Sequence, residues 1–103
     1  MEMDAETIAS LIKTHRVRLK GRQLAALNKA IFSRDGCRCV ACGAYVDPET
    51  KFHHEPCGPD KSDEIEKGAV LCRRCHAERH FGADGQAIRR QVQDYLAEMY
   101  GGQ

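Results

Sequence analysis

The fold of this chain is decided by residues 70–80, which read Val-Leu-Cys-Arg-Arg-Cys-His-Ala-Glu-Arg-His. Within this stretch Cys72 and Cys75 have the short spacing that lets both thiolates of one tight turn reach a single ion. A matching pair, Cys39 and Cys42, lies upstream. Two such pairs predict a closed, tetrahedral four-thiolate zinc site, which is structural because no coordination position remains for water. Disulfides or free thiols are the alternative.

Two histidines follow the second cysteine pair. Because His76 and His80 are four residues apart, they project from one face of a helix that begins at this turn, as two ligands of one ion would. A further pair, His53 and His54, lies between the two cysteine pairs. These histidines predict a second metal site. The alternative is a histidine at a helix start, a surface histidine and no ion.

Length and cysteine content predict a single domain that spans residues 1–103 and whose modest core is supplemented by bound metal. Six cysteines are compatible with a secreted disulfide scaffold. The paired spacing, and the lack of an apolar segment near Met1, favour a reducing, cytoplasmic compartment instead. No apolar run approaches the roughly 20 residues that a membrane span needs, so we expect no membrane partner. Cys37 and Cys57 are left over, and Cys37 competes with Cys39 as a ligand without having its spacing to Cys42.

Charge is strongly segregated although the net charge is only +1. Between Lys13 and Arg38 the only acid is Asp35, whereas the charged residues of the segment 47–66 are acidic except for Lys51 and Lys61. The basic region indicates contact with phosphate groups, and an ordinary solvated helix face is the alternative. We expect nucleic-acid contacts from six residues of this region and of the second cysteine turn: Arg16, Arg18, Lys20, Arg22, Arg73 and Arg74.

Hydrophobic spacing predicts a helix that starts at Asp4, has Leu19 on its buried face and ends at Gly21. A second helix is predicted at about 22–34. Short strands at 51–54 and 69–71 should pair antiparallel on either side of a loop at 55–63 that is rich in proline and glycine. A third helix should run from about 74 to 81, and a fourth from about 84 to 100.

The two cysteine pairs, the paired-histidine strand and the Cys-x-x-Cys-His sequence resemble the HNH endonucleases over about residues 33–81. The resemblance implies a small α+β protein with the ββα-metal (HNH) fold, in which a two-stranded antiparallel hairpin and a helix grip one metal. The domain would comprise N-terminal helices at 1–32, the HNH core at 33–81 and a C-terminal helix at 84–100. Residues 1–20 and 84–103 lie outside the resemblance.

Family positions also imply roles for the histidines. His54 falls where the family places its general base, His53 where it has a metal ligand, and His76 on another ligand position. His80 has a counterpart in the branch that includes the colicin DNases. Because Pro56 lies closer to His54 than the family's usual spacing, the base could instead be His53.

The resemblance implies a metal-dependent DNA endonuclease that nicks or cuts phosphodiester bonds with weak sequence specificity. Its cofactors would be structural Zn²⁺ and one catalytic Mg²⁺, Mn²⁺ or Ni²⁺ ion. Its partner would be DNA, and the resemblance leaves open whether the protein also forms a homodimer. Lys67 stands where the family usually carries an Asn that orients the base, and lysine cannot accept a hydrogen bond. The alternatives are a non-catalytic zinc-stabilised module that binds DNA or protein, and a plain zinc ribbon with incidental histidines.

Overall fold

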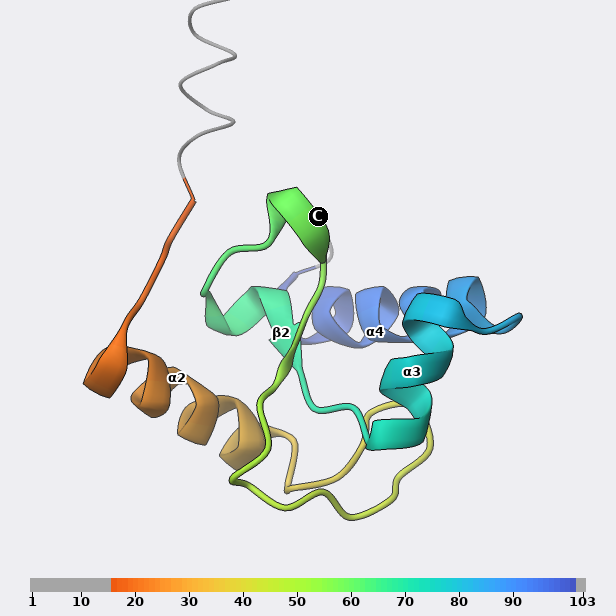
Figure 1. Cartoon of the computed structure of the whole chain (residues 1–103), viewed down its shortest axis with the longest axis horizontal. Helices are drawn as coiled ribbons and strands as arrows, with labels where there is room; N and C mark the ends of the chain where they lie inside the picture. The colour runs from red at the N-terminus through yellow and green to blue at the C-terminus, as the bar shows by residue number, and fades with distance from the viewer. Residues whose placement is uncertain (1–15, 102–103) are drawn as a thin grey trace, which may run out of the picture.

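A computed structural model describes residues 16–101 of the chain. The helices lie around a central hairpin (Figure 1). In chain order the elements are α2 (Gly21–Arg34), β1 (His53–His54), the 3₁₀ turns η1 (Gly58–Asp60) and η2 (Ile65–Lys67), β2 (Gly68–Ala69), α3 (Arg73–Phe81) and α4 (Gly85–Tyr100).

The hairpin pairs β1 with β2 antiparallel, with His53 opposite Ala69 and His54 opposite Gly68. The predicted hairpin is therefore confirmed, but both strands are shorter than expected. Beyond the paired residues, backbone groups form hydrogen bonds with side chains and loops instead. For example, Phe52 N–H donates to Asn28 Oδ1 at 2.8 Å. The short hairpin relies on its surroundings, because two strands alone are marginal in water.

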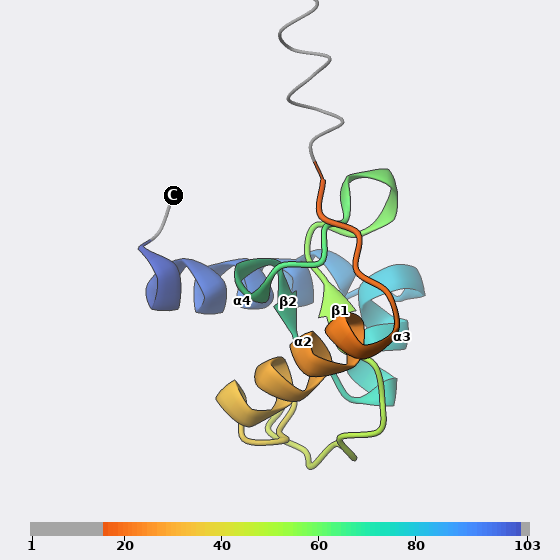
Figure 2. The same ribbon diagram turned by 90° about the vertical axis from the view of Figure 1, so that its left-hand side faces the viewer.

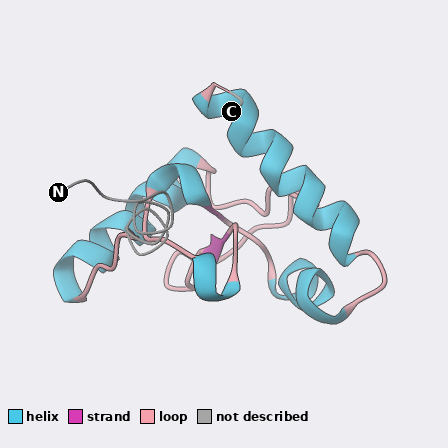
Figure 3. Cartoon of the chain, turned by 90° about the horizontal axis from the view of Figure 1, so that it is seen from above, coloured by secondary structure: helices cyan, strands magenta, loops and turns pink. Residues whose placement is uncertain are grey.

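Helix α2 covers one side of the hairpin, and α3 and α4 lie on the other side (Figures 2 and 3). The apolar spacing that predicted α2 and α4 buries one face of each, with Ile31 and Phe32 from α2 and Val92 from α4 almost fully inaccessible to solvent. A Cβ atom at Gly68 would lie only 2.6 Å from Phe52 Cδ2, so glycine permits the close approach of β2 to the core.

The end of α2 is joined to β2 and α4 by the neighbouring residues Arg34 and Asp35. The buried Asp35 carboxylate accepts hydrogen bonds from Arg34 Nε at 2.7 Å, from Val70 N–H at 2.9 Å and from the Tyr95 hydroxyl. Arg34 Nη2 donates to the Gly68 carbonyl at 2.6 Å. Because every partner of this buried carboxylate is a donor, its charge is compensated and the three elements keep a fixed relation.

The predicted first helix is wrong where it can be compared with the structure. Its residues 1–15 lie outside the described part of the chain, but residues 16–20 are not helical. Their backbone groups pair with the loop at 62–63: Val17 N–H donates to Ser62 Oγ, and Leu19 N–H donates to Asp63 Oδ2, both at 2.8 Å. Gly21 does not end a helix but begins α2, with a φ of +51°. Long-range hydrogen bonds therefore override the helical spacing of Leu19.

The described chain is a small α+β structure with one two-stranded antiparallel hairpin, three α-helices and a cluster of four cysteines. Helices α2, α3 and α4 begin and end within about one residue of the predicted limits, which is the usual uncertainty of a helix end. No helix among residues 16–101 combines the length and the apolar character that crossing a membrane requires.

Candidate metal centres

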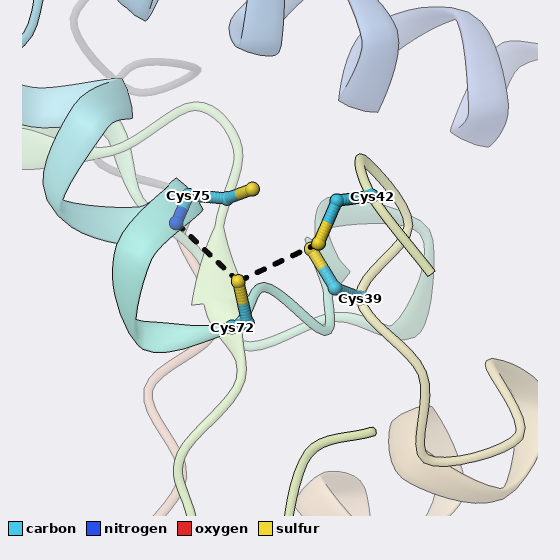
Figure 4. A group of neighbouring side chains, drawn as sticks. All are labelled: Cys39, Cys42, Cys72 and Cys75. Carbon is cyan, nitrogen blue, oxygen red and sulfur yellow. Dashed lines mark hydrogen bonds between the residues drawn. The ribbon is translucent and has the colours of Figure 1, made fainter. Parts of the chain in front are cut away.

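The four cysteines predicted to bind zinc lie together. Their sulfur atoms are all within 4.8 Å of one another, and the side chains converge from the loop at 39–42 and the start of α3 (Figure 4). Cys42 Sγ and Cys72 Sγ are 3.7 Å apart. A tetrahedral ion with zinc–sulfur bonds of about 2.3 Å places its ligands about 3.8 Å apart. The cluster therefore fits a metal ion such as zinc.

Local backbone structure holds both cysteine turns in place. Cys72 is the N-cap of α3, and its Sγ accepts a hydrogen bond from Cys75 N–H at 3.4 Å. Gly43, in the first turn, has a φ of +82°, a conformation that residues with a Cβ rarely adopt. A hydrogen bond from the Ala44 backbone is the main cause that lowers the pKa of the Cys42 thiol to about 7, which favours the thiolate that binds metal. The two remaining cysteines, Cys37 and Cys57, lie outside this cluster.

The three histidines predicted to bind the catalytic ion form a second cluster. His53 from β1 and His76 and His80 from α3 each offer a ring nitrogen within 4.8 Å of the others. The Nε2 atoms of His76 and His80 are 3.2 Å apart. Two imidazole nitrogens bound about 2.1 Å from one ion would be separated by about 3.0 to 3.4 Å, so the geometry fits a shared divalent cation.

The protonation of these histidines also suits a cation. Burial lowers the pKa of His76, and the neighbouring His53, His80 and Arg79 lower it further. The pKa of His80 is lowered by burial and then by His53 and Arg79, against a smaller opposing effect of Glu55. Neutral imidazoles carry the lone pair that a metal requires, so at neutral pH both side chains are ready to bind one.

A buried carboxylate is hydrogen-bonded to His53. Glu55, which is 5% exposed, accepts a hydrogen bond from His53 Nε2 at 3.0 Å. Arg79 binds both Glu55 oxygens, because its Nε donates to Oε1 and its Nη2 donates to Oε2, each at 3.0 Å. Burial alone would raise the pKa of Glu55, but the hydrogen bonds from His53 and Arg79 outweigh it and hold the pKa at about 2. Because the ionised Glu55 only accepts, His53 Nε2 carries the proton and Nδ1 keeps the lone pair.

His54 lies apart from this cluster. Its Nε2 is 2.8 Å from Oδ1 of Asp63, and the other Asp63 oxygen accepts Leu19 N–H at 2.8 Å. Burial opposes ionisation of Asp63, but the hydrogen bonds from His54 and Leu19 prevail and lower its pKa. Since the carboxylate only accepts, we assign the shared proton to His54 Nε2, which leaves Nδ1 free to accept another.

The side chain of Lys67 is directed to Glu64 and not to His54. Its ammonium group pairs with the Glu64 carboxylate at 3.4 Å, and the side chain lines a hollow beside α4 together with Glu55 and Pro56. The residue that holds the His54 ring is Asp63, which sequence reasoning did not single out.

Glu55 and Arg79 were missed as well, although each carried a signal. Glu55 is two residues from His53 and so shares its strand face, and Arg79 lies three residues after His76 and so shares its helix face. Asp63 gave no such signal, because it approaches His54 across a loop.

The six cations predicted to contact nucleic acid fall into separate groups. Arg18 and Lys20 line a groove that contains His54, whereas Arg73 lines a hollow that contains His76. Arg74 lies beside the cysteine cluster, where Cys42 and the other thiols raise its pKa. Arg22 is exposed on α2 and Arg16 is half-buried.

Comparison of the chain with protein-family models, with curated proteins and with solved structures found no match. Function must therefore be inferred from the two clusters and from the residues around them.

Proposed function

We propose that this protein is a metal-dependent endonuclease of the HNH type, which hydrolyses phosphodiester bonds in DNA with weak sequence specificity. The observation that carries the proposal is the convergence of His53, His76 and His80 from β1 and α3. The order of elements supports it: cysteine turn, histidine-bearing strand, second strand, second cysteine turn, histidine-bearing helix. This is the order expected of a ββα-metal fold.

The cysteine cluster of this enzyme holds a structural zinc ion through Cys39, Cys42, Cys72 and Cys75. With four thiolates as ligands the site is closed, so it contributes to folding and leaves catalysis to the histidines. Cys75 and His76 are adjacent at the start of α3. The zinc site therefore fixes the helix turn from which the second centre is built.

The histidine cluster holds one Mg²⁺, Mn²⁺ or Ni²⁺ ion through His53, His76 and His80. When bound, such an ion stabilises negative charge on the phosphate and on the leaving oxygen. Glu55 and Arg79 fix the ring of His53, so that its lone pair faces a constant direction.

His54 is the general base in this proposal. Asp63 holds its Nε2–H, which leaves Nδ1 to take a proton from the attacking water. A carboxylate behind an imidazole both orients the ring and stabilises the imidazolium that forms, as in other histidine-dependent hydrolases. His53 is a less suitable base, because it lies among the ligating histidines and its remaining ring nitrogen is needed as a metal ligand.

A second candidate function is a non-catalytic, zinc-stabilised module that binds DNA or protein. The observation that favours it is the position of His54 in a groove with Asp63, outside the histidine cluster. In that case the zinc site would maintain the fold and the basic groove would do the binding. The two candidates differ in whether any divalent ion supports hydrolysis.

The test is an assay of supercoiled plasmid with purified, zinc-loaded protein and added Mg²⁺, Mn²⁺ or Ni²⁺. The proposal expects nicked or linear product with at least one of these ions and none in metal-free buffer or after EDTA. Retention of supercoiled DNA with every ion would contradict the nuclease. If the same protein still shifted the DNA in a gel, that result would select the binding module.

A further inference from the structure

A groove of about 720 Å³ lies beside His54, and we call it the His54 groove. One wall is formed by residues 18–28, where the extended segment enters α2. The segment 49–54 and the loop at 61–63 form the remaining walls. Leu24 and Phe52 give it an apolar lining, and the His54–Asp63 pair lies within it. Its size is that of a ligand site and not of a packing defect.

Four cations line the His54 groove: Arg18, Lys20, Lys51 and Lys61. None of them forms an ion pair with a carboxylate of residues 16–101. The acids in the groove are Glu49 and Asp63, and both Asp63 oxygens are already occupied by His54 and Leu19. Four cations against two carboxylates leave the groove with an excess of positive charge, even though Arg18 lies close enough to lower the pKa of Asp63, and such an excess suits a polyanion.

The His54 groove is connected with the histidine cluster through one residue. Lys51 lines both this groove and a second hollow of about 430 Å³ that contains Arg73 and His76. A ligand with regularly spaced negative charges could therefore pass from one to the other over Lys51. A single phosphate or a small anion would occupy only one of the two.

We infer that the His54 groove holds the sugar–phosphate backbone of one strand of nucleic acid, on one side of the phosphate that faces the histidine cluster. This inference deepens the proposed function, on which it rests for the identity of the substrate. Arg18, Lys20 and Lys61 contact phosphates that flank the reacting one, and Lys51 lies between the two hollows. Sugar and base edges of the strand contact the apolar wall at Leu24.

The test measures binding without cleavage, with a fluorescein-labelled single-stranded DNA of about 20 nucleotides as the probe, long enough to exceed the usual site size for a single strand. Affinity is determined by fluorescence anisotropy in Ca²⁺ over a series of NaCl concentrations. The double variant Lys20→Ala/Lys61→Ala removes two cations from the groove. The matched control, Lys29→Ala/Arg90→Ala, removes two exposed cations of α2 and α4 that do not line it. Circular dichroism melting verifies that both variants fold.

For the groove variant we expect the negative slope of log K against log salt to become shallower by about 1.4, the value for two phosphate contacts on a single strand. The control should keep the slope of the wild type. Equal losses in both variants would overturn the inference in favour of general surface attraction. Tighter, groove-dependent binding of poly-glutamate than of the DNA would overturn it in favour of an acidic protein partner. Groove-dependent DNA binding without hydrolysis in any metal would uphold the inference while refuting the proposed nuclease.

Discussion

His54 and Asp63 form a hydrogen-bonded pair in which imidazole Nε2 lies 2.8 Å from carboxylate Oδ1. The pair joins β1 to the loop before η2, and through Leu19 N–H it also holds the segment that leads into α2. A residue nine positions away, in a loop, thus sets the orientation of the proposed base. In the family that the sequence resembles, an Asn at the position of Lys67 would be expected to do this.

Replacing Asp63 with Asn should slow hydrolysis without unfolding the protein. The ring loses the acceptor that orients it, so part of the roughly 10²- to 10⁴-fold contribution of a general base is lost. Asp60→Asn, an exposed acid of the same loop, is the control. An unchanged single-turnover rate in Asp63→Asn would show that this pair has no part in the reaction.

Lys67→Asn should have little effect on the rate. The Lys67 side chain pairs with Glu64 and lines a hollow beside α4, so an Asn there would not reach His54. Single-turnover rates and DNA affinity in Ca²⁺ should both remain within about fivefold of the wild type, since a surface pair contributes at most about 1 kcal/mol. A large rise in rate would mean that an Asn at this position does orient the base, as the family pattern implies.

Replacing Glu55 with Gln should weaken the histidine cluster as a metal site. Loss of the carboxylate that fixes a metal-binding histidine typically costs about 10- to 100-fold in metal affinity. The readout is the affinity for Mn²⁺, measured by electron paramagnetic resonance on zinc-loaded protein. Glu66→Gln, at an exposed acid outside the His53 contacts, controls for the loss of charge. Equal affinities of the Glu55→Gln variant and the wild type would exclude this supporting role.

Cys72→Ser should unfold or aggregate the protein, because metal binding by four thiolates supplies folding free energy on the order of 10 kcal/mol. Cys57→Ser, which lies outside the cluster, should keep the thermal midpoint of the wild type within a few degrees. Zinc analysis of protein purified without chelator should give one ion per chain. A zinc-free wild type, or a Cys72→Ser variant of unchanged stability, would disprove a structural zinc site.

Much of the fold could be predicted from local pattern. The spacing of the cysteines and the apolar periods of α2 and α4 are properties of short segments, and the structure confirms that the four cysteines cluster and that both helices form. The hairpin was also predictable, because a loop rich in proline and glycine separates two short apolar runs. The segment 16–20 was not, because Ser62 and Asp63 compete for its backbone groups from far along the chain.

For the same reason, only part of the candidate site could be predicted from the sequence. Histidines four apart on a helix, and a histidine pair between cysteine turns, could be identified by spacing. The partners that orient them, Glu55 and Asp63, depend on how loops and elements meet in space. The closeness of His53 to His76 and His80, with His54 held elsewhere, likewise depends on the pleat of β1 and on its register with β2.

The proposed enzyme is tested most directly by the single-turnover rate at which supercoiled plasmid is nicked in Mn²⁺ by wild type, His53→Ala, His54→Ala and His76→Ala, each verified to contain zinc. We predict that His54→Ala lowers the rate by about 10²- to 10⁴-fold at every Mn²⁺ concentration, since it removes the proton acceptor. His76→Ala should need much more Mn²⁺ for half-maximal rate, because it removes a ligand. If His54→Ala cleaves at the wild-type rate and His53→Ala is inactive, His53 and not His54 is the base. Wild-type rates in all three variants would contradict the histidine site altogether.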